Sequence, residues 1–406
     1  MLDPGELVGE RWFADKDRRV AGVRVVDSLE PSPGVALLVI EVEFVHGPPA
    51  LYTVPDGSGL WPALLAALAD GPQGRFELRD AGDLFGLRQE RLLGIDQSNT
   101  SYVLDERVVL KCYRRLQPGT HPEVELVTLL SGAPEVPAAR GSLHYVAADG
   151  SEWALALLQD FVAGARDGWG WAEDVLRALL AGERSLEDAT AWGAELGTVS
   201  RRLHDALAAA GLGTRPAAPE DLRAWRRAAE EQLARVLELV DAETAAELGA
   251  EAGRIRAELA HLEVPAQPPL LTRVHGDYHV GQILHSPAGF HVIDFEGEPT
   301  KPAEERRALG APLRDVAAML RSIDHLARWV LRELPDPESQ RTAEAWIAGA
   351  RSRFLGAYGP VDAGLLRALE VEKETYEFSY AATFLPSWMF VPRASMRALL
   401  AEPSPR

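Results

Sequence analysis

The spacing of apolar residues changes once along the chain, and this change limits the folds that the chain can adopt. The first 90 residues contain apolar, β-branched runs such as VAGVRVV and ALLVIEVEFV, separated by the turn sequence PSPG. Runs of this kind, bounded by turn residues, predict strands. From about residue 170 onward, apolar residues recur at three- and four-residue spacing, which is typical of helices. We therefore expect an α+β protein with a β-rich front and a mostly helical body.

Two hairpins are predicted in addition to these regions. TSYVL and RVVLKCY flank Asp105 and Glu106, and two strands joined by two residues form a plausible β-hairpin. HPEVELVTLL then has helical spacing, and WALALLQDFV at residues 153–162 predicts a buried strand. Within the helical region, QILHS and FHVIDF predict a second hairpin around the turn PAG. This order of elements is typical of a bilobal kinase-like fold.

The length of 406 residues favours more than one packed unit. We expect an N-terminal cap over residues 1–90, an intermediate β-rich N-lobe over residues 91–162, and a helical C-lobe over residues 163–406. The net charge of -19 argues against nucleic acid as a partner, because phosphate backbones attract clustered Lys and Arg. The single cysteine excludes an intramolecular disulfide.

The sequence has no apolar run long enough to span a membrane and no basic stretch followed by an apolar one near its start. We therefore expect a cytoplasmic protein without a membrane partner. The oligomeric state is not fixed by the sequence, and a monomer is favoured.

The stretch HGDYHVGQILHSPAGFHVIDFEGEP carries residues suited to phosphoryl transfer. Asp277 and Gln282 are five residues apart, as are the catalytic Asp and the metal-binding Asn of the kinase catalytic loop. Asp294 stands at a strand end, where the Asp of D-F-G would be. We expect Asp277 to accept the proton of the acceptor hydroxyl, and Gln282, Asp294 and Glu296 to hold Mg²⁺. Glu298 fits the metal shell and an ordinary surface position equally well.

Lys111 lies on the apolar strand RVVLKCY, the context of the kinase lysine that pairs with the phosphates of ATP. Glu125, early in the next predicted helix, is the expected partner of an ion pair with this lysine. Glu123 competes with it, but it would face another side of the helix.

The loop GIDQSNTSYVL lacks the glycines of G-x-G-x-x-G, yet its small polar residues are suited to contact phosphates. The adenine would lie against the end of the buried strand, at Gln159, Asp160, Phe161 and Val162, whose backbone would serve as the hinge. The expected ATP-binding residues are Lys111, Glu125, Gln97, Ser98, Asn99, Thr100, Ser101, Gln159, Phe161 and Val162.

Several longer segments resemble the actinobacterial maltokinase-like branch of the aminoglycoside phosphotransferase, or eukaryotic-like kinase, superfamily. They are RWFADKDR, DQSNTSYVL, VVLKCYRRLQPGTHPEVE, HGDYHVGQIL, VIDFEGEPTKPAEERRALGAPLRDVAAMLRSID and YEFSYAATFLPSWM. The resemblance implies a cap subdomain, an intermediate subdomain carrying Lys111 and a helical C-lobe. It also implies ATP, Mg²⁺ and a sugar acceptor.

Two members of this branch differ in their acceptor. Maltokinases phosphorylate the anomeric hydroxyl of maltose, and glucosamine kinases phosphorylate the 6-hydroxyl of the free amino sugar. The chain looks shorter than a typical maltokinase and has Tyr278 where maltokinases usually have leucine. We therefore favour glucosamine 6-phosphate over maltose 1-phosphate as the product.

Two further alternatives fit the sequence less well. An aminoglycoside phosphotransferase would suit the acidic charge, but DFEGEP and the cap favour a sugar kinase. A kinase-like protein without catalysis would be expected to lose Lys111, Asp277 or Asp294, and the chain keeps all three.

The segment EKETYEFSYAATFLPSW offers both acids and aromatic rings to an acceptor. A protonated amine needs carboxylate partners such as Glu374 or Glu377, and a sugar ring packs on aromatic side chains. A helical stripe of core aromatics is an equally good interpretation of Tyr376, Tyr380 and Trp388. Arg321 is expected either to face the acceptor or to pair with Asp315 or Asp324. The expected acceptor-binding residues are Asp277, His279, Arg321, Glu377, Tyr380 and Trp388.

Overall fold

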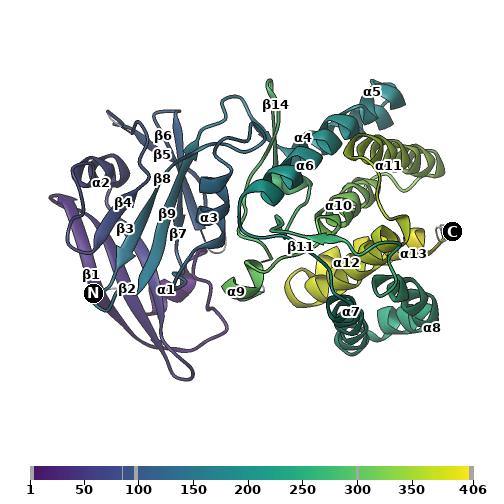
Figure 1. Cartoon of the computed structure of the whole chain (residues 1–406), viewed down its shortest axis with the longest axis horizontal. Coiled ribbons are helices and arrows are strands. Elements are labelled where there is room, and N and C mark those ends of the chain that lie inside the picture. Colours follow the sequence, from purple (N-terminus) through teal and green to yellow (C-terminus); the bar gives the residue numbers. More distant parts are fainter. Residues whose placement is uncertain (1–3, 85, 96–98, 299–300, 402–406) are drawn as a thin grey trace. The chain divides into compact units, whose positions relative to one another are not determined.

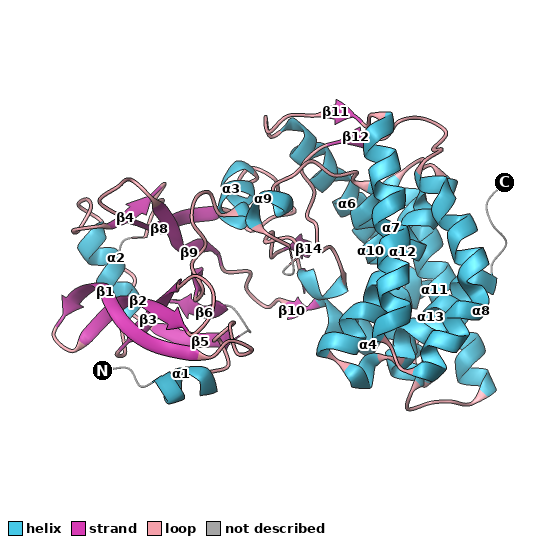
Figure 2. Cartoon of the chain, turned by 90° about the horizontal axis from the view of Figure 1, so that it is seen from below, coloured by secondary structure: helices cyan, strands magenta, loops and turns pink. Residues whose placement is uncertain are grey.

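The computed structural model describes residues 4–84, 86–95, 99–298 and 301–401. The chain divides into two compact units, Met1–Ala163 and Gly164–Arg406 (Figure 1). The first unit is built mainly from strands and the second mainly from helices (Figure 2). The expected α+β class is therefore confirmed. The further division of the front part at residue 90 stays a prediction.

The first unit begins with a three-stranded antiparallel sheet in the order β1-β2-β3. Its inner face buries Ile40, Val42 and Tyr52 against Trp12 and Phe13, which belong to the RWFADKDR segment. The elements are α1 (Pro4–Gly9), β1 (Val20–Ser32), β2 (Val35–Phe44), β3 (Ala50–Asp56) and α2 (Leu60–Leu68).

A six-stranded sheet in the order β4-β8-β9-β7-β6-β5 completes the first unit. The predicted hairpin of β6 and β7 forms, but the pairing closes at Leu104 and Val108, so Arg107 belongs to the connection. Asp105 and Glu106 have positive φ angles of 48° and 51°, as the tight turn requires. The elements are β4 (Phe76–Arg79), β5 (Glu90–Ile95), β6 (Asn99–Leu104), β7 (Val108–Tyr113), α3 (Pro122–Leu129), β8 (Ala139–Val146) and β9 (Glu152–Asp160).

Helix α10 (Leu313–Leu331) is buried along most of its length and contacts α11, α12 and α13 in the second unit. Glycines allow α6 to lie directly against α11, because a Cβ atom on Gly193 would come within 2.4 Å of the carbonyl oxygen of Ala350. The other helices of the second unit are α4 (Gly168–Leu180), α5 (Leu186–Thr190), α6 (Trp192–Ala209), α7 (Pro219–Leu239), α8 (Ala242–Leu259), α9 (Ala303–Arg306), α11 (Pro337–Tyr358), α12 (Ala363–Phe384) and α13 (Phe390–Ala401).

The predicted second hairpin interrupts the helices between α8 and α9. Strands β13 (Ile283–Ser286) and β14 (Gly289–Val292) pair from Ile283 opposite Val292 to Ser286 opposite Gly289. The loop of residues 275–282 precedes this hairpin and the segment of residues 293–298 follows it, so the hairpin brings the two close together. The remaining short elements are β10 (Arg166–Asp167), β11 (Arg215–Pro216), η1 (Ala260–Leu262), β12 (Leu270–Leu271), η2 (Val280–Gln282) and η3 (Pro386–Trp388).

Among the residues that the structure describes, no helix combines the length and apolar character needed to cross a membrane.

Candidate active site

The loop of residues 275–282, called the catalytic loop below, is fixed to helix α10 by hydrogen bonds. The N–H groups of its first two residues donate to the two carboxylate oxygens of Asp315, over 2.8 and 3.0 Å. The N–H of Val280 donates to the hydroxyl of Ser322 over 3.0 Å. Both acceptors are buried on α10, so this helix sets the backbone position of the loop.

Asp315 keeps its negative charge although it is buried. Burial alone raises the pKa of a carboxyl, but His204, at 3.3 Å, and the donated backbone N–H groups hold the pKa of Asp315 below its usual range. The ionised carboxylate can therefore accept both hydrogen bonds from the catalytic loop.

Tyr278 and His275 point into the protein beneath the catalytic loop. The hydroxyl of the fully buried Tyr278 shares a hydrogen bond of 2.7 Å with the hydroxyl of Ser200. The Nε2 atom of His275 lies 2.9 Å from the carbonyl oxygen of Ile293 and donates to it. Tyr278 thus supports the loop from inside.

Asp277 carries the only carboxylate of the catalytic loop, and its side chain is 24% exposed. Burial raises the pKa of Asp277 to about 6. The positive charge of Lys373 opposes this shift, and the negative charges of Asp294 and Glu377 add to it. At neutral pH the carboxylate is therefore ionised, and it is also a better proton acceptor than an ordinary aspartate.

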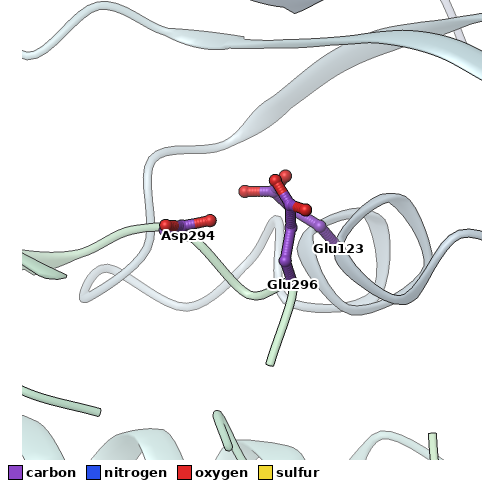
Figure 3. Close-up of side chains that lie close together, drawn as sticks. All are labelled: Glu123, Asp294 and Glu296. Carbon is purple, nitrogen blue, oxygen red and sulfur yellow. The ribbon is translucent and has the colours of Figure 1, made fainter. Parts of the chain in front are cut away.

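The side-chain N–H of Gln282 donates to the carboxylate of Asp294 over 3.0 Å. This bond leaves the amide oxygen of Gln282 as the atom that can bind a cation. Asp294 has a φ of 66°, a left-handed backbone conformation that is uncommon outside glycine. Figure 3 shows Asp294 and Glu296 leaving the same short segment after β14. Two carboxylates and one amide oxygen form a donor set that suits Mg²⁺.

The positions of Glu296 and Glu298 are stabilised by basic residues nearby. The guanidinium of Arg306 donates to the carbonyl oxygen of Glu296 over 2.9 Å and lies 3.9 Å from its carboxylate. Lys301 forms an ion pair of 2.6 Å with Glu298. The contact with Lys301 favours a structural position for Glu298.

Lys111 on β7 forms an ion pair with Glu123 on α3, with 2.9 Å between Nζ and Oε2. The hydroxyl of Tyr113 donates to the same oxygen over 2.8 Å, and Glu123 is almost fully buried. Figure 3 shows the Glu123 side chain on its helix. The preference for Glu125 is therefore corrected: α3 begins at Pro122, and residues two positions apart face different sides of a helix.

The expected phosphate-contacting residues are only partly described. Gln97 and Ser98 lie outside the described residues. Asn99, Thr100 and Ser101 begin β6, and Ser101 is the neighbour of Lys111 across the sheet.

The expected adenine-contacting residues lie at the end of β9. The side-chain N–H of the buried Gln159 donates to the carbonyl oxygen of Pro137 over 3.1 Å. The backbone N–H of Phe161 donates to the carbonyl oxygen of Arg107 over 2.9 Å. Both N–H groups therefore form hydrogen bonds within the first unit. The adenine contacts predicted for Gln159, Phe161 and Val162 stay predictions.

A cavity of about 570 Å³ opens beside Asp277 within the second unit. Helix α12 lines it with Lys373 and Tyr376, and helix α7 lines it with Trp225. In the described part of the chain, the lining residues do not include Glu377.

Lys373 was not predicted as a site residue. Its Nζ atom lies 2.9 Å from the carboxylate of Glu377, one helical turn further along α12. The chain has only Lys16, Lys111, Lys301 and Lys373 as lysines, and the spacing of Lys373 from a predicted acceptor-binding acid was the signal that could have identified it.

His279 lies next to Asp277, with 3.8 Å between its Nε2 atom and the carboxylate. Its Nδ1 atom accepts a hydrogen bond from the N–H of Gly281 over 3.0 Å. Burial, together with the charge of Lys373, lowers the pKa of His279 to about 4. The ring is therefore neutral at physiological pH.

Arg321 does not face an acceptor in this structure, because it is only 3% exposed. Its guanidinium pairs with Glu370 at 3.1 Å, Glu374 at 3.5 Å and Asp324 at 3.8 Å. Glu374 is fully buried and also bonds to His325 at 2.9 Å. The alternative expectation, a pair with Asp324, is thereby confirmed. The acceptor role of Arg321 is corrected, because a buried guanidinium that links α10 to α12 has no open face for a sugar.

The two aromatic residues predicted to contact the acceptor differ in their surroundings. Tyr380 is 38% exposed and stands one turn before Phe384, with ring centroids 5.4 Å apart. Trp388 packs near Trp169 and Trp329, with centroid distances of 5.9 and 5.4 Å. Tyr380 has the more accessible ring.

Comparison with known proteins places these features in a family. Residues 90–349 match the model described as the phosphotransferase enzyme family. A glucosamine kinase of Streptacidiphilus jiangxiensis is 36% identical over 85% of this chain and 82% of its own length. A glucosamine kinase of Mycolicibacterium smegmatis is 32% identical over 85% of this chain and 89% of its own length.

Solved structures are similar over almost the whole chain. A glucosamine kinase in complex with glucosamine, ADP and inorganic phosphate is 32% identical, with a TM-score of 0.78. The match covers 98% of this chain and 99% of that one. A second crystal form of glucosamine kinase also gives a TM-score of 0.78 and 32% identity, with 98% and 97% of the two chains covered. The expected kinase-like fold is thereby confirmed.

Proposed function

The chain belongs to the phosphotransferase enzyme family, and from this premise we propose that it is an ATP-dependent kinase that phosphorylates the 6-hydroxyl of glucosamine. The observation that carries the proposal is the cavity that Asp277, a proton acceptor, lines together with Lys373, whose ammonium lies 2.9 Å from the carboxylate of Glu377. One carboxylate can take the hydroxyl proton, and the other can bind the ammonium of an amino sugar. The relatives named glucosamine kinase support this acceptor.

The reaction needs one proton acceptor in the protein. As the 6-hydroxyl oxygen of glucosamine bonds to the γ-phosphorus of ATP, its proton passes to the carboxylate of Asp277. The bond between the γ-phosphorus and the bridging oxygen breaks, and ADP leaves with the electron pair. The catalytic loop, held by Asp315, keeps the carboxylate in position.

Asp294, Gln282 and Glu296 would hold Mg²⁺ through their oxygen atoms. When bound, Mg²⁺ supplies positive charge that neutralises the phosphate oxygens. The amide of Gln282 orients the side chain of Asp294, and Arg306 binds the backbone carbonyl oxygen of Glu296 and lies 3.9 Å from its carboxylate.

Lys111 is proposed to bind the α- and β-phosphates of ATP, with Glu123 keeping its ammonium in place. Asn99, Thr100 and Ser101 belong to the predicted phosphate-contacting segment, together with Gln97 and Ser98. For the acceptor, Glu377 would bind the ammonium, while Tyr380 and Trp388 would contact the sugar ring and the neutral His279 a hydroxyl.

The proposal is tested by measuring ADP release with ATP and Mg²⁺ in the presence of glucosamine, glucose, maltose or kanamycin. Asp277→Asn is the control, because it preserves the shape of the side chain and removes the proton acceptor. Turnover on glucosamine that is lost in this variant supports the proposal. Preferred turnover on maltose or kanamycin, or no turnover on any of them, contradicts it.

A further inference from the structure

Lys373 is a cation of the proposed site to which no role has yet been assigned. Its Nζ atom is 2.9 Å from Glu377, and its side chain lines the same cavity as Asp277. Its ammonium is also 4.5 Å from the ring centroid of Tyr376, so the lysine stem is held along α12. The cation thus pairs with the expected ammonium-binding acid and lines the cavity that the expected proton acceptor also lines.

The charges around Lys373 explain why it stays with Glu377 in the absence of an acceptor. The Glu377 side chain is 14% exposed, and a largely buried carboxylate is unfavourable without a partner. Burial opposes ionisation of this carboxyl, but Lys373 and His325 hold the pKa of Glu377 below its usual range. Glu377 and Asp277 in turn hold the pKa of Lys373 above its usual range, against the effect of burial.

We propose that Lys373 is an exchangeable cation: the ammonium of the amino sugar takes its place on Glu377, and the released Lys373 moves to Asp277 and the phosphoryl group. This inference rests on the proposed function. The exchange keeps the total charge of the buried carboxylates compensated, since one ammonium replaces another. The four-carbon stem and single compact charge of lysine suit such a movement.

The exchange links amino-sugar binding to catalysis. Glucose carries no ammonium, so Lys373 stays on Glu377 when glucose binds. With glucosamine, the released ammonium of Lys373 lies where negative charge develops as the γ-phosphoryl group moves to the 6-hydroxyl. The proton of that hydroxyl still passes to Asp277, and ADP still leaves with the electron pair, so Lys373 forms no covalent bond and gives up no proton.

The test compares wild type, Lys373→Met, Lys373→Arg and Glu377→Gln with glucosamine and with glucose, measuring kcat and KM for each sugar. In Lys373→Met, kcat on glucosamine should fall about 100-fold, since one preorganised charge is lost. Its KM for glucosamine should stay the same or fall, because Glu377 is already open to the ammonium. Lys373→Arg should recover part of kcat, because the cation is restored.

Glu377→Gln should behave in a different way. Its KM for glucosamine should rise about tenfold, because a charged partner of the ammonium is lost. Its kcat on glucose should rise, because Lys373 is no longer held by Glu377. The preference for glucosamine over glucose should therefore largely disappear. Lys16→Met, at an exposed lysine of the first unit, is the matched control and should leave all four constants unchanged.

A pH profile distinguishes this role from a purely structural one. Asp277 faces the charges of Lys373, Glu377 and Asp294, with His275 and the neutral His279 beside it. Lys373 favours the ionised form of Asp277, so Lys373→Met should move the acidic limb of kcat/KM to higher pH. A lysine that only stabilised α12 would leave this limb in place.

Two results would overturn the inference. One is a Lys373→Met enzyme with the wild-type kcat and pH profile on glucosamine, and the other is a Glu377→Gln enzyme that keeps the wild-type preference for glucosamine. Both require a wild-type enzyme that is active on glucosamine. If the wild-type enzyme shows no such turnover, the proposed function itself is wrong.

Discussion

The carboxylate of Asp315 on α10 accepts a hydrogen bond of 2.8 Å from the backbone N–H of His275 at the start of the catalytic loop. The next N–H donates to the second oxygen of the same carboxylate over 3.0 Å. The buried, ionised carboxylate of Asp315 thus accepts hydrogen bonds from backbone N–H groups that have no partner strand. The position of the proton acceptor two residues later depends on this support.

Replacement of Asp315 by asparagine tests this support. Asn offers one acceptor oxygen in place of two, so one loop N–H loses its partner inside the protein. We expect the free energy of unfolding to fall by about 1–3 kcal/mol and kcat to fall with it. Urea denaturation and steady-state kinetics measure both. Asp205→Asn, which removes an exposed ion pair with Arg201, is the control and should change neither quantity appreciably.

Glu123 and Glu125 in the first turn of α3 allow a prediction in which one acid is the control for the other. Glu123→Gln removes the charge that holds Lys111, so kcat/KM for ATP should fall about tenfold or more. Glu125→Gln changes the neighbouring acid that the sequence had favoured and should have a much smaller effect. Equal losses in the two variants would show that the ion pair with Glu123 has no special role in binding ATP.

The pKa of Asp277 predicts how activity depends on pH. A proton acceptor must be ionised, so kcat/KM should rise through the pKa of about 6 and become constant above it. Bound Mg²⁺ adds positive charge near the site and would move this limb to lower pH. Profiles measured with subsaturating glucosamine and saturating ATP and Mg²⁺ give the value. An acidic limb near pH 4, where an ordinary aspartate titrates, that does not depend on the Mg²⁺ concentration would contradict the effect of burial.

The raised pKa of Asp277 also predicts that its ionised carboxylate lowers the stability of the folded protein. The pKa of Asp277 rises from 3.8 to about 6 on folding, so the folded state disfavours the ionised form. Asp277→Asn should therefore stabilise the protein by about 1–3 kcal/mol at pH 7. This gain should decrease between pH 6 and pH 4 and be absent at lower pH, where both states carry the protonated acid. Denaturation curves at pH 7 and pH 4 test it, and equal gains at the two pH values would contradict it.

Local sequence patterns predicted the features that depend on local chemistry. The spacing of apolar residues predicted the α+β class, and the turn PAG between two apolar runs predicted the hairpin β13–β14. The kinase-like spacing of Asp277, Gln282 and Asp294 assigned Gln282 and Asp294 to one site, and the structure joins their side chains by a hydrogen bond. Each of these inferences needed only residues that are near one another in the chain.

Features that depend on how helices pack against neighbouring elements could not be predicted from the sequence. The choice between Glu123 and Glu125 depends on where α3 begins and on which of its faces turns toward β7. Lys373 becomes a site residue only because α12 lies beside the catalytic loop. The burial of Arg321 likewise follows from the packing of α10 against α12. Asp324, one turn away on α10, could be predicted as a partner, but Glu370 and Glu374 come from α12.

The corrected position of Arg321 leads to a prediction that separates folding from acceptor binding. Arg321→Met removes one of the buried cations that compensate Glu370, Glu374 and Asp324 inside the second unit. Breaking a buried ion network by removing one partner costs about 3–5 kcal/mol, so we expect a large loss of stability in denaturation experiments. The enzyme that remains folded should keep its KM for glucosamine within about twofold, because Arg321 does not reach the acceptor. A stable variant with a greatly increased KM for glucosamine would instead restore Arg321 to the acceptor site.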